Sequence, residues 1–355
     1  MHYVYMVKSM GKISLLDCTL RDGGYVNKWN FGYSTVVDIL EKMISTGVEI
    51  VEAGFIRDVT YDSNLAVFSN LTDFDKLLAD NQIVKNASSF ATMAEIAHPI
   101  PLDHIEEASM TQCDIIRVIV WKSKHTEDGA EVDALQESYE YCKSIVEKGY
   151  KLCVQPNRTD QYSDEEFVNM LNMFANLKPY AIYVVDSWGT MYSDQVLHYM
   201  KLADQTIDKS IAIGFHGHNN MMQAFSTAEK IIESDFDREI ILDASIDGIG
   251  RGAGNLNLEL IARYMNERCG KKYCLEPMYE IYDKFIKEIK QSHVWGSSFP
   301  FLISAMNNAN PNYAAYFTDD MTLEQMQSAY DVMENDDAVL YTDKLAEKYK
   351  NIILK

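Results

Sequence analysis

The sequence lacks the features that mark membrane-spanning and nucleic-acid-binding proteins. No stretch of its 355 residues approaches the roughly 20 consecutive apolar residues of a membrane helix. Basic residues are also scarce, because 32 Lys and Arg stand against 53 Asp and Glu, which gives a net charge of −21 at pH 7. Nucleic acid and anionic lipid attract basic surfaces, so we expect neither as a partner. An anionic substrate would need a nearby metal ion or arginine to overcome this acidic field.

Paired cysteines are missing as well. Six cysteines are scattered through the chain, with no Cys-x-x-Cys pair, and several lie inside apolar strand or helix patterns. The spacing therefore predicts buried free thiols rather than disulfides, and with them a cytoplasmic protein. The remaining composition, 47% apolar and 24% charged, is typical of a globular protein with a large core.

What the sequence does contain is a regular alternation of short apolar runs and amphipathic helical patterns. This alternation predicts parallel β-α-β units, and eight units in about 260 residues fit an α/β protein of the (β/α)8 TIM-barrel type. An open, doubly wound sheet is the alternative, but its glycine-rich turn usually comes early, and here it comes last. The predicted strands are residues 13–17, 49–55, 82–90, 114–121, 151–157, 181–187, 211–216 and 240–246.

Two further segments complete the predicted organisation. Residues 58–80 have an irregular pattern, which we interpret as a loop that lies over a site. From about residue 271 the alternation stops, and the chain becomes polar and helical with an Asn/Pro break at 307–312. We therefore expect a TIM-barrel catalytic domain over residues 13–270 and a small C-terminal helical region over 271–355.

Polar residues gather where the predicted strands end. In a barrel the carboxyl ends of the strands converge on the face that carries catalysis. Any one of these residues has a structural alternative; Glu52, for example, would suit a buried partner for an arginine. The set comprises Arg21, Asp22, Glu52, Arg57, Asn86, Lys122, Gln155, Asn157, Asp186, Ser187, His216, His218, Asp243 and Asn255.

His216 and His218 form the most specific pair of this set. Side chains repeat every two residues along a strand, so both imidazoles point the same way, and burying them without polar partners would be costly. With Asp22 on the same face, they make a ligand set for a divalent metal with open coordination positions. Asn255 would add a further ligand or a group beside the ligands. Mn²⁺, Mg²⁺, Co²⁺ and Zn²⁺ all accept such mixed ligands.

The glycine-rich turn at residues 248–254 follows the last predicted strand. It is not a dinucleotide fingerprint, because no early β-α-β unit accompanies it. Its backbone amides would suit a carboxylate or phosphate near a helix start, or the segment is simply a tight turn. The sequence leaves both interpretations open.

Three motifs together resemble the DRE-TIM metallolyase superfamily: Leu20-Arg21-Asp22-Gly23, His216-Gly217-His218-Asn219-Asn220 and the Gly-Arg-Gly-Ala-Gly-Asn turn. Within it, residues 183–187 and the Thr-Leu-Arg-Asp-Gly run look most like the 4-hydroxy-2-oxovalerate aldolase branch. The resemblance implies that Asp22, His216 and His218 bind Mn²⁺ or Mg²⁺. It also implies that Arg21 stabilises a pyruvate enolate, and that Arg21, Ser187 and His216 face a 2-oxo acid substrate.

The chain departs from that branch at two positions. Tyr25 stands where the aldolases have a histidine base, and a tyrosine has a solution pKa of about 10. Gly296, after Trp295, stands where they have a tyrosine. Tyr25 is the first candidate for the catalytic base and a metal-bound water the second. We expect a different aldehyde from that of the aldolases, larger and more polar.

The resemblance implies a class II aldolase that cleaves or forms 4-hydroxy-2-oxo acids through a pyruvate enolate. The alternative is an acyl-CoA lyase or synthase of the HMG-CoA lyase or isopropylmalate synthase type, although the glycine turn lacks the cysteine of those lyases. A third hypothesis is a barrel retained only as a binding subunit. The C-terminal region would support a homodimer or an aldehyde dehydrogenase partner.

Overall fold

A closed barrel of parallel strands forms the centre of the molecule. The computed structural model describes residues 12–125 and 131–355. Strand β1 pairs on one side with β11 and on the other with β2, so the sheet closes on itself and the open-sheet alternative is excluded. In the described residues the eight barrel strands are β1 (Ile13–Asp17), β2 (Ile50–Ile56), β4 (Ser89–Glu95), β5 (Cys113–Val120), β8 (Lys151–Pro156), β9 (Ala181–Asp186), β10 (Ala212–Gly217) and β11 (Ile240–Ala244).

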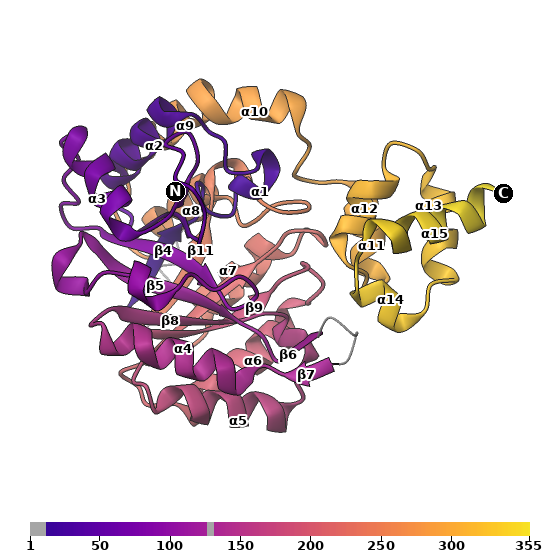
Figure 1. The fold of residues 1–355 in the computed structure, drawn as a ribbon, viewed down its shortest axis with the longest axis horizontal. Coiled ribbons are helices and arrows are strands. Elements are labelled where there is room, and N and C mark those ends of the chain that lie inside the picture. The colour runs from indigo at the N-terminus through magenta and orange to yellow at the C-terminus, as the bar shows by residue number, and fades with distance from the viewer. Residues whose placement is uncertain (1–11, 126–130) are drawn as a thin grey trace, which may run out of the picture.

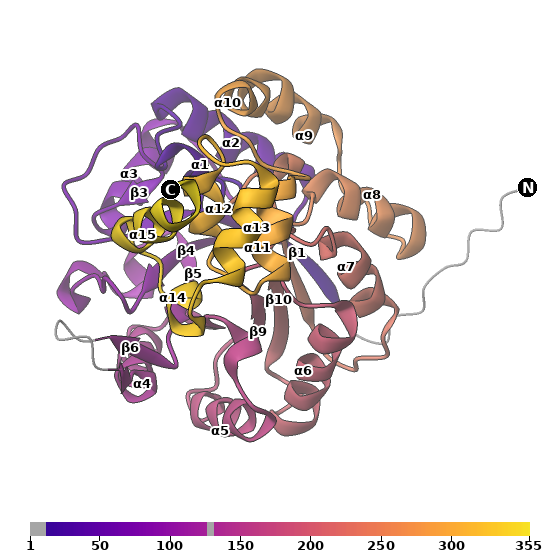
Figure 2. The same ribbon diagram turned by 90° about the vertical axis from the view of Figure 1, so that its right-hand side faces the viewer.

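Helices surround this barrel, as Figures 1 and 2 show. Their inner faces pack on the strands through one large apolar cluster that runs from Ile13 to Trp295. None of the helices in the described parts of the chain has the length and hydropathy that a bilayer crossing requires. The helices that follow barrel strands are α2 (Tyr33–Thr46), α3 (Leu71–Asp80), α4 (Leu135–Glu147), α5 (Asp164–Ala175), α6 (Ser193–Thr206), α7 (Ala224–Glu233) and α8 (Leu258–Arg268).

The predicted TIM barrel is thus confirmed, and so are several local signals. Ser163 and Glu166 form the expected capping box at the start of α5. Gly47 ends α2 in the left-handed conformation. All six cysteines are free thiols, and four of them are buried.

The prediction of a loop over residues 58–80 is wrong. The segment contains a short strand, β3 (Val67–Phe68), which pairs with β2, and then helix α3. The Asn70 side chain caps this helix by accepting a hydrogen bond from the backbone N–H of Asp73. Leu71, Phe74, Leu77 and Leu78 form its buried face.

The third strand was also predicted wrongly, at residues 82–90. Strand β4 covers Ser89–Glu95 instead, and Asn86 lies before it in an exposed turn with a left-handed backbone. The buried residues of β4 are mostly small, whereas the preceding Val84 is 69% exposed. Asn86 therefore lies at the amino-terminal end of the barrel, away from the catalytic face.

Beyond the barrel, the chain first runs along its outer surface and then forms a separate bundle. Helices α9 (Glu276–Ile281) and α10 (Lys287–Ser292), joined by the π-helical turn η5 (Tyr282–Ile286), belong to the barrel side, where α9 packs on α2. A second buried apolar cluster, between Ala309 and Tyr349, holds the bundle together. The bundle consists of α11 (Phe299–Met306), α12 (Pro311–Phe317), α13 (Leu323–Asp331), α14 (Asn335–Val339) and α15 (Asp343–Leu354).

The bundle lies over the carboxyl ends of the barrel strands, and Figure 2 shows it in front of the barrel. Asn308 accepts a hydrogen bond from Arg158, which follows β8, and Asn310 accepts one from Arg251, which follows β11. The division of the chain after residue 270 stays a proposal. Because Trp295 is still part of the barrel cluster, the packing supports a division between Trp295 and α11.

Candidate active site

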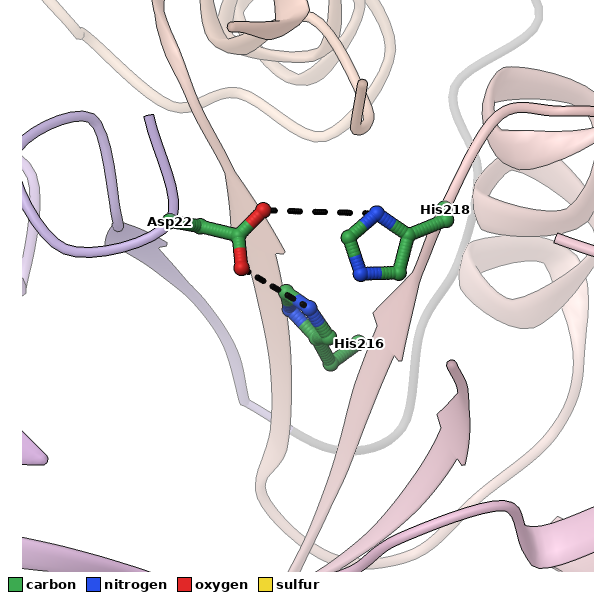
Figure 3. Close-up of side chains that lie close together, drawn as sticks. All are labelled: Asp22, His216 and His218. Atoms are coloured by element: carbon green, nitrogen blue, oxygen red, sulfur yellow. Dashed lines mark ion pairs between the residues drawn. The ribbon is translucent and has the colours of Figure 1, made fainter. Parts of the chain in front are cut away.

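Asp22, His216 and His218 meet at the carboxyl end of the barrel (Figure 3). Asp22 lies in the turn after β1, His216 is in β10, and His218 comes directly after that strand. One Asp22 carboxylate oxygen lies 3.9 Å from His216 Nε2 and the other lies 4.0 Å from His218 Nδ1. One ligand atom from each of the three buried side chains falls within 4.8 Å of the others. The three residues that the strand-end argument selected as metal ligands thus lie together.

The charge state of these groups fits a divalent cation. Burial alone would raise the pKa of Asp22, but Arg21 and the two imidazoles hold it well below its ordinary value. Burial lowers the pKa of His218 to about 4, so its imidazole is neutral near pH 7. His218 Nδ1 is buried and finds no hydrogen-bond partner among the described residues. A carboxylate, the neutral His218 imidazole and its orphaned nitrogen are groups that a Mn²⁺- or Mg²⁺-type ion would satisfy.

Asn255 reaches the same carboxylate from the turn after β11. Its amide nitrogen donates to Asp22 at 2.7 Å and to the Ile249 carbonyl at 3.1 Å. Its Oδ1 is buried without a hydrogen-bond partner in the described chain. In this arrangement the amide orients Asp22, and Asn255 as a metal ligand remains a prediction.

Gly250 is the residue of the glycine turn that lies closest to these groups. A Cβ added there would lie 2.3 Å from Asn255 Nδ2 and 2.5 Å from Asp22 Oδ2. Several backbone amides of the turn, including those of Gly248, Gly254 and Asn255, donate within the protein. The segment therefore acts as a tight turn that makes room for the Asp22 carboxylate.

We expect Gly250→Ala to lower activity about 100-fold, because the methyl group would displace the Asp22 carboxylate by a large fraction of an ångström. The measurement is the rate of product formation at saturating metal, together with the metal dissociation constant. Gly149→Ala is a control for a glycine substitution outside the site, since Gly149 lies in the turn before β8. Wild-type metal affinity and rate in Gly250→Ala would contradict this account.

A chain of buried ion pairs connects Arg21 and His216 beneath the candidate metal ligands. Arg21 pairs with Asp22 at 2.5 Å and with Glu52 at 2.8 Å. Arg117, fully buried in β5, pairs with Glu52 at 2.7 Å and with Asp243. Asp243 in turn hydrogen-bonds His216 Nδ1 at 3.0 Å, which leaves Nε2 to face Asp22. Glu52 is thus the arginine partner that the sequence suggested.

Arg117 was missed by the sequence reasoning. The available signal was a charged residue in the middle of the otherwise apolar strand 114–121, since such a charge is buried only when paired. Both arginines have buried nitrogens without a hydrogen-bond partner in the described chain, among them Arg21 Nη2, but of the two only Arg21 lines the pocket. Arg21 Nη2 is free to donate to a ligand.

The pocket above the three candidate ligands combines polar and apolar walls. Ser187 accepts a hydrogen bond from the backbone N–H of Arg158 and donates to Asn157 Oδ1, both at 2.9 Å. Gln155 Nε2 is buried and unpaired within the described chain. The lining residues are Arg21, Asp22, Tyr25, Met93, Ile119, Gln155, Asn157, Val185, Ser187, His216, His218 and Arg251.

Tyr25 lies in the short helix α1 (Gly24–Asn27) at the wall of this pocket. Its ring makes edge contacts with Trp29 and Phe55, at centroid distances of 4.8 and 6.2 Å. Burial raises the pKa of its phenol above the usual value of 10, against a smaller opposing effect of Arg21. The hydroxyl therefore keeps its proton at neutral pH, and a catalytic role for Tyr25 stays a prediction.

Some strand-end residues are absent from the pocket lining. Lys122 pairs with Glu166 of α5 at 2.8 Å, and Arg57 pairs with Glu95 at 3.1 Å. Asp186 accepts hydrogen bonds from the backbone amides of Thr190 and Met191 and holds the turn after β9. These three side chains have structural partners.

Comparison with known proteins agrees with this geometry. A family model described as HMGL-like matches residues 12–283, which includes the whole barrel and every candidate ligand. The chain belongs to the HMGL-like family. The resemblance to the DRE-TIM enzymes is thereby confirmed.

Curated relatives of this HMGL-like protein are distant. A 4-hydroxy-2-oxovalerate aldolase of Desulfitobacterium hafniense is 23% identical over 261 residues, 72% of each chain. An oxaloacetate decarboxylase of Mycobacterium tuberculosis is 24% identical over 257 residues, 72% of this chain and 70% of the relative. Further relatives of similar identity are also named 4-hydroxy-2-oxovalerate aldolase.

Solved structures share the fold of this HMGL-like protein. The N-terminal domain of a provisionally assigned aldolase from Bacteroides vulgatus superimposes with a TM-score of 0.69 at 20% identity, covering 87% of this chain and 97% of that one. The HMG-CoA lyase of Brucella melitensis gives a TM-score of 0.60 at 14% identity, covering 79% and 99%. At these identities the superpositions establish the TIM-barrel fold.

Proposed function

We propose that this protein is a divalent-metal-dependent aldolase that cleaves or forms 4-hydroxy-2-oxo acids through a pyruvate enolate. The observation that carries the proposal is Arg21, which lines the pocket together with Asp22, His216 and His218 and whose buried Nη2 has no partner in the described chain. Family membership and the relatives named as aldolases support lyase chemistry. Within it, we propose Mn²⁺ or Mg²⁺ as the metal and, from the free thiols, a reducing compartment such as the cytoplasm.

In this proposal Asp22, His216 and His218 hold the metal, which supplies Lewis acidity when bound. Arg21 donates through Nη2 to the oxygen on which negative charge develops as the enolate forms. Glu52 and Asp22 fix the guanidinium in place, so little reorganisation accompanies the reaction. Ser187 and its partner Asn157 lie on the wall where the carboxylate of the 2-oxo acid would bind.

We assign to Tyr25 the transfer of the proton to and from the aldol hydroxyl. In condensation the enolate carbon of pyruvate attacks the aldehyde carbon, and the aldehyde oxygen takes a proton from the phenol as the carbon–carbon bond forms. In cleavage the deprotonated oxygen of Tyr25 takes the proton of the substrate hydroxyl as that bond breaks, which regenerates the phenol. Because the pKa of Tyr25 is raised, its protonated form dominates at neutral pH, which favours the role of donor.

The test is lactate-dehydrogenase-coupled pyruvate release from a panel of 4-hydroxy-2-oxo acids, with Mn²⁺, with Mg²⁺ and with EDTA. We expect release with at least one substrate and one metal, and loss of release in EDTA. Free-thiol release from acetyl-CoA or a 3-hydroxyacyl-CoA, without pyruvate from the panel, would overturn the aldolase proposal in favour of the acyl-CoA alternative. Full activity in EDTA would overturn the metal requirement.

Oxaloacetate belongs in the same panel, because one relative is named as its decarboxylase. Its decarboxylation breaks the C3–C4 bond, releases CO₂ and leaves the same pyruvate enolate, which then takes a proton at C3. Pyruvate from oxaloacetate alone would make decarboxylation the function. A homodimer or a dehydrogenase partner bound through the C-terminal region remains a separate proposal, which a sizing column with and without candidate dehydrogenases would test.

A further inference from the structure

Arg251 is an arginine in the pocket wall that forms no ion pair with an acidic side chain of the described residues. It lies in the turn after β11, and its Nη2 donates to Asn310 Oδ1 at 3.2 Å and to Asn312 Oδ1 at 3.3 Å. Both acceptors are neutral amides of the C-terminal bundle. Among the described residues no ion pair within 4.0 Å involves Arg251, whereas Arg21 in the same pocket has two carboxylate partners.

A second arginine lies close enough to add to this positive field. Arg158, in the loop after β8, is buried, stacks on Trp188 at 3.2 Å from the ring centroid, and donates to Asn308 of the bundle at 3.2 Å. Arg158 Nη2 forms an ion pair with Asp160 Oδ2 at 2.5 Å, and Arg158 Nη1 has no hydrogen-bond partner in the described chain. Burial and the proximity of Arg158 lower the pKa of Arg251 below its ordinary value.

The position of this charge relative to the reaction follows from its neighbours. Arg251 and Tyr25 line the same pocket and are close enough to interact electrostatically. In the proposed mechanism the aldehyde half of the substrate lies beside Tyr25, and therefore within the same pocket as Arg251. Arg21 and the candidate metal ligands also line this pocket. Arg251 is partly buried, and removing its charge from water without a paired carboxylate costs free energy that a bound anion would offset.

We propose that Arg251 binds an anionic group, a carboxylate or a phosphate, on the aldehyde half of the substrate. This inference rests on the proposed aldolase function and narrows its substrate class to aldehydes that carry a negative charge. A guanidinium held by two amide oxygens keeps nitrogens available for such a group, and a charge-assisted pair is the strong form of this contact. The glycine turn therefore contributes an anion site through a side chain rather than through its backbone amides.

The experiment compares kcat/KM for three 4-hydroxy-2-oxo acids that differ only in the group beyond C4: a methyl, a carboxylate and a phosphate monoester. We expect at least one anionic substrate to exceed the methyl compound, and Arg251→Gln to reduce that ratio about 10- to 100-fold, mainly through KM. The anionic compound whose kcat/KM falls more in Arg251→Gln carries the anion that the site prefers. A ratio in favour of the methyl compound, or an unchanged ratio in Arg251→Gln, would overturn the proposal.

Two control variants separate charge recognition from other effects. Arg263→Gln removes the same charge from the exposed outer face of α8, where Arg263 pairs with Glu267 at 2.8 Å, and should leave the ratio unchanged. Asn312→Ala removes one contact to the bundle but keeps the arginine. If Asn312→Ala reduced the ratio as much as Arg251→Gln, the arginine would act by holding the bundle, and the proposal would be overturned.

A binding measurement keeps this inference distinguishable from the proposed function. Inorganic phosphate should raise the Tm of the EDTA-treated protein and of Arg263→Gln, and raise that of Arg251→Gln less. If no substrate released pyruvate while phosphate binding still depended on Arg251, the aldolase proposal would fail and the anion site would stand. If pyruvate formed and phosphate binding were identical in all three proteins, the anion site would fail alone.

Discussion

Asp22→Ala should abolish metal-dependent pyruvate release, with a fall in kcat/KM of about 1,000-fold or more. The substitution removes the only carboxylate among the three candidate ligands, and it leaves Arg21 Nη1 without its closest partner. Losing one charge-stabilising group in an active site already costs about 100- to 1,000-fold, and Asp22 supplies both a ligand and a charge. The measurements are the coupled pyruvate assay and the metal content after gel filtration.

The control for Asp22→Ala is Asp235→Ala, because Asp235 is an exposed aspartate between α7 and β11. It should retain wild-type metal content and rate. An Asp22→Ala variant with more than a tenth of wild-type activity would contradict the proposed metal site. Full metal content in that variant would also contradict it, since two imidazoles without a carboxylate make a weak site for Mn²⁺ or Mg²⁺.

Arg117→Met should destabilise the protein by about 3–5 kcal/mol, the usual result of removing one partner from a buried ion pair. Arg117 has no exposed surface, and the substitution leaves Glu52 and Asp243 buried with one cation fewer. Activity should fall as well, because Glu52 orients Arg21 and Asp243 orients His216. Urea denaturation at pH 7 measures the free energy of unfolding.

The exposed Arg263→Gln variant is the comparison for Arg117→Met, with an expected change within about 0.5 kcal/mol. A loss below about 1 kcal/mol in Arg117→Met would show that the buried pairs contribute little beyond the cost of removing them from water. Normal stability with reduced activity would assign Arg117 a positioning role alone.

The sequence predicted the barrel and the meeting of Asp22, His216 and His218 because both depend on local patterns. Once the barrel is assumed, these residues can be selected without knowledge of distant contacts. Arg21 and Asp22 follow the end of a strand, and the two histidines are two residues apart. Strand β4 was misplaced because its buried residues are small, so the more apolar Ile83-Val84 pair attracted the prediction. Helix α3 was missed although Asn70 and the apolar spacing of Leu71 and Phe74 were visible signals.

Other parts of the site could not be predicted from the sequence in this way. Arg117 meets Asp243 across 126 residues, and Arg251 meets Asn310 across 59. No periodicity links such pairs, since they are brought together only by barrel closure and by the position of the C-terminal bundle. The role of Tyr25 depends on its surroundings for the same reason, because burial determines its pKa.

The separation of Asp22 from Asn255 by 233 residues determines when the site can exist during synthesis of the chain. The ribosome releases Asp22 early, but His216 and His218 follow only with β10, and β1 finds its partner β11 later still. A nascent or truncated chain that ends before β10 carries one of the three candidate ligands. A metal ion bound as proposed would therefore find its full ligand set only after β10 has joined the barrel, late in the synthesis of the chain.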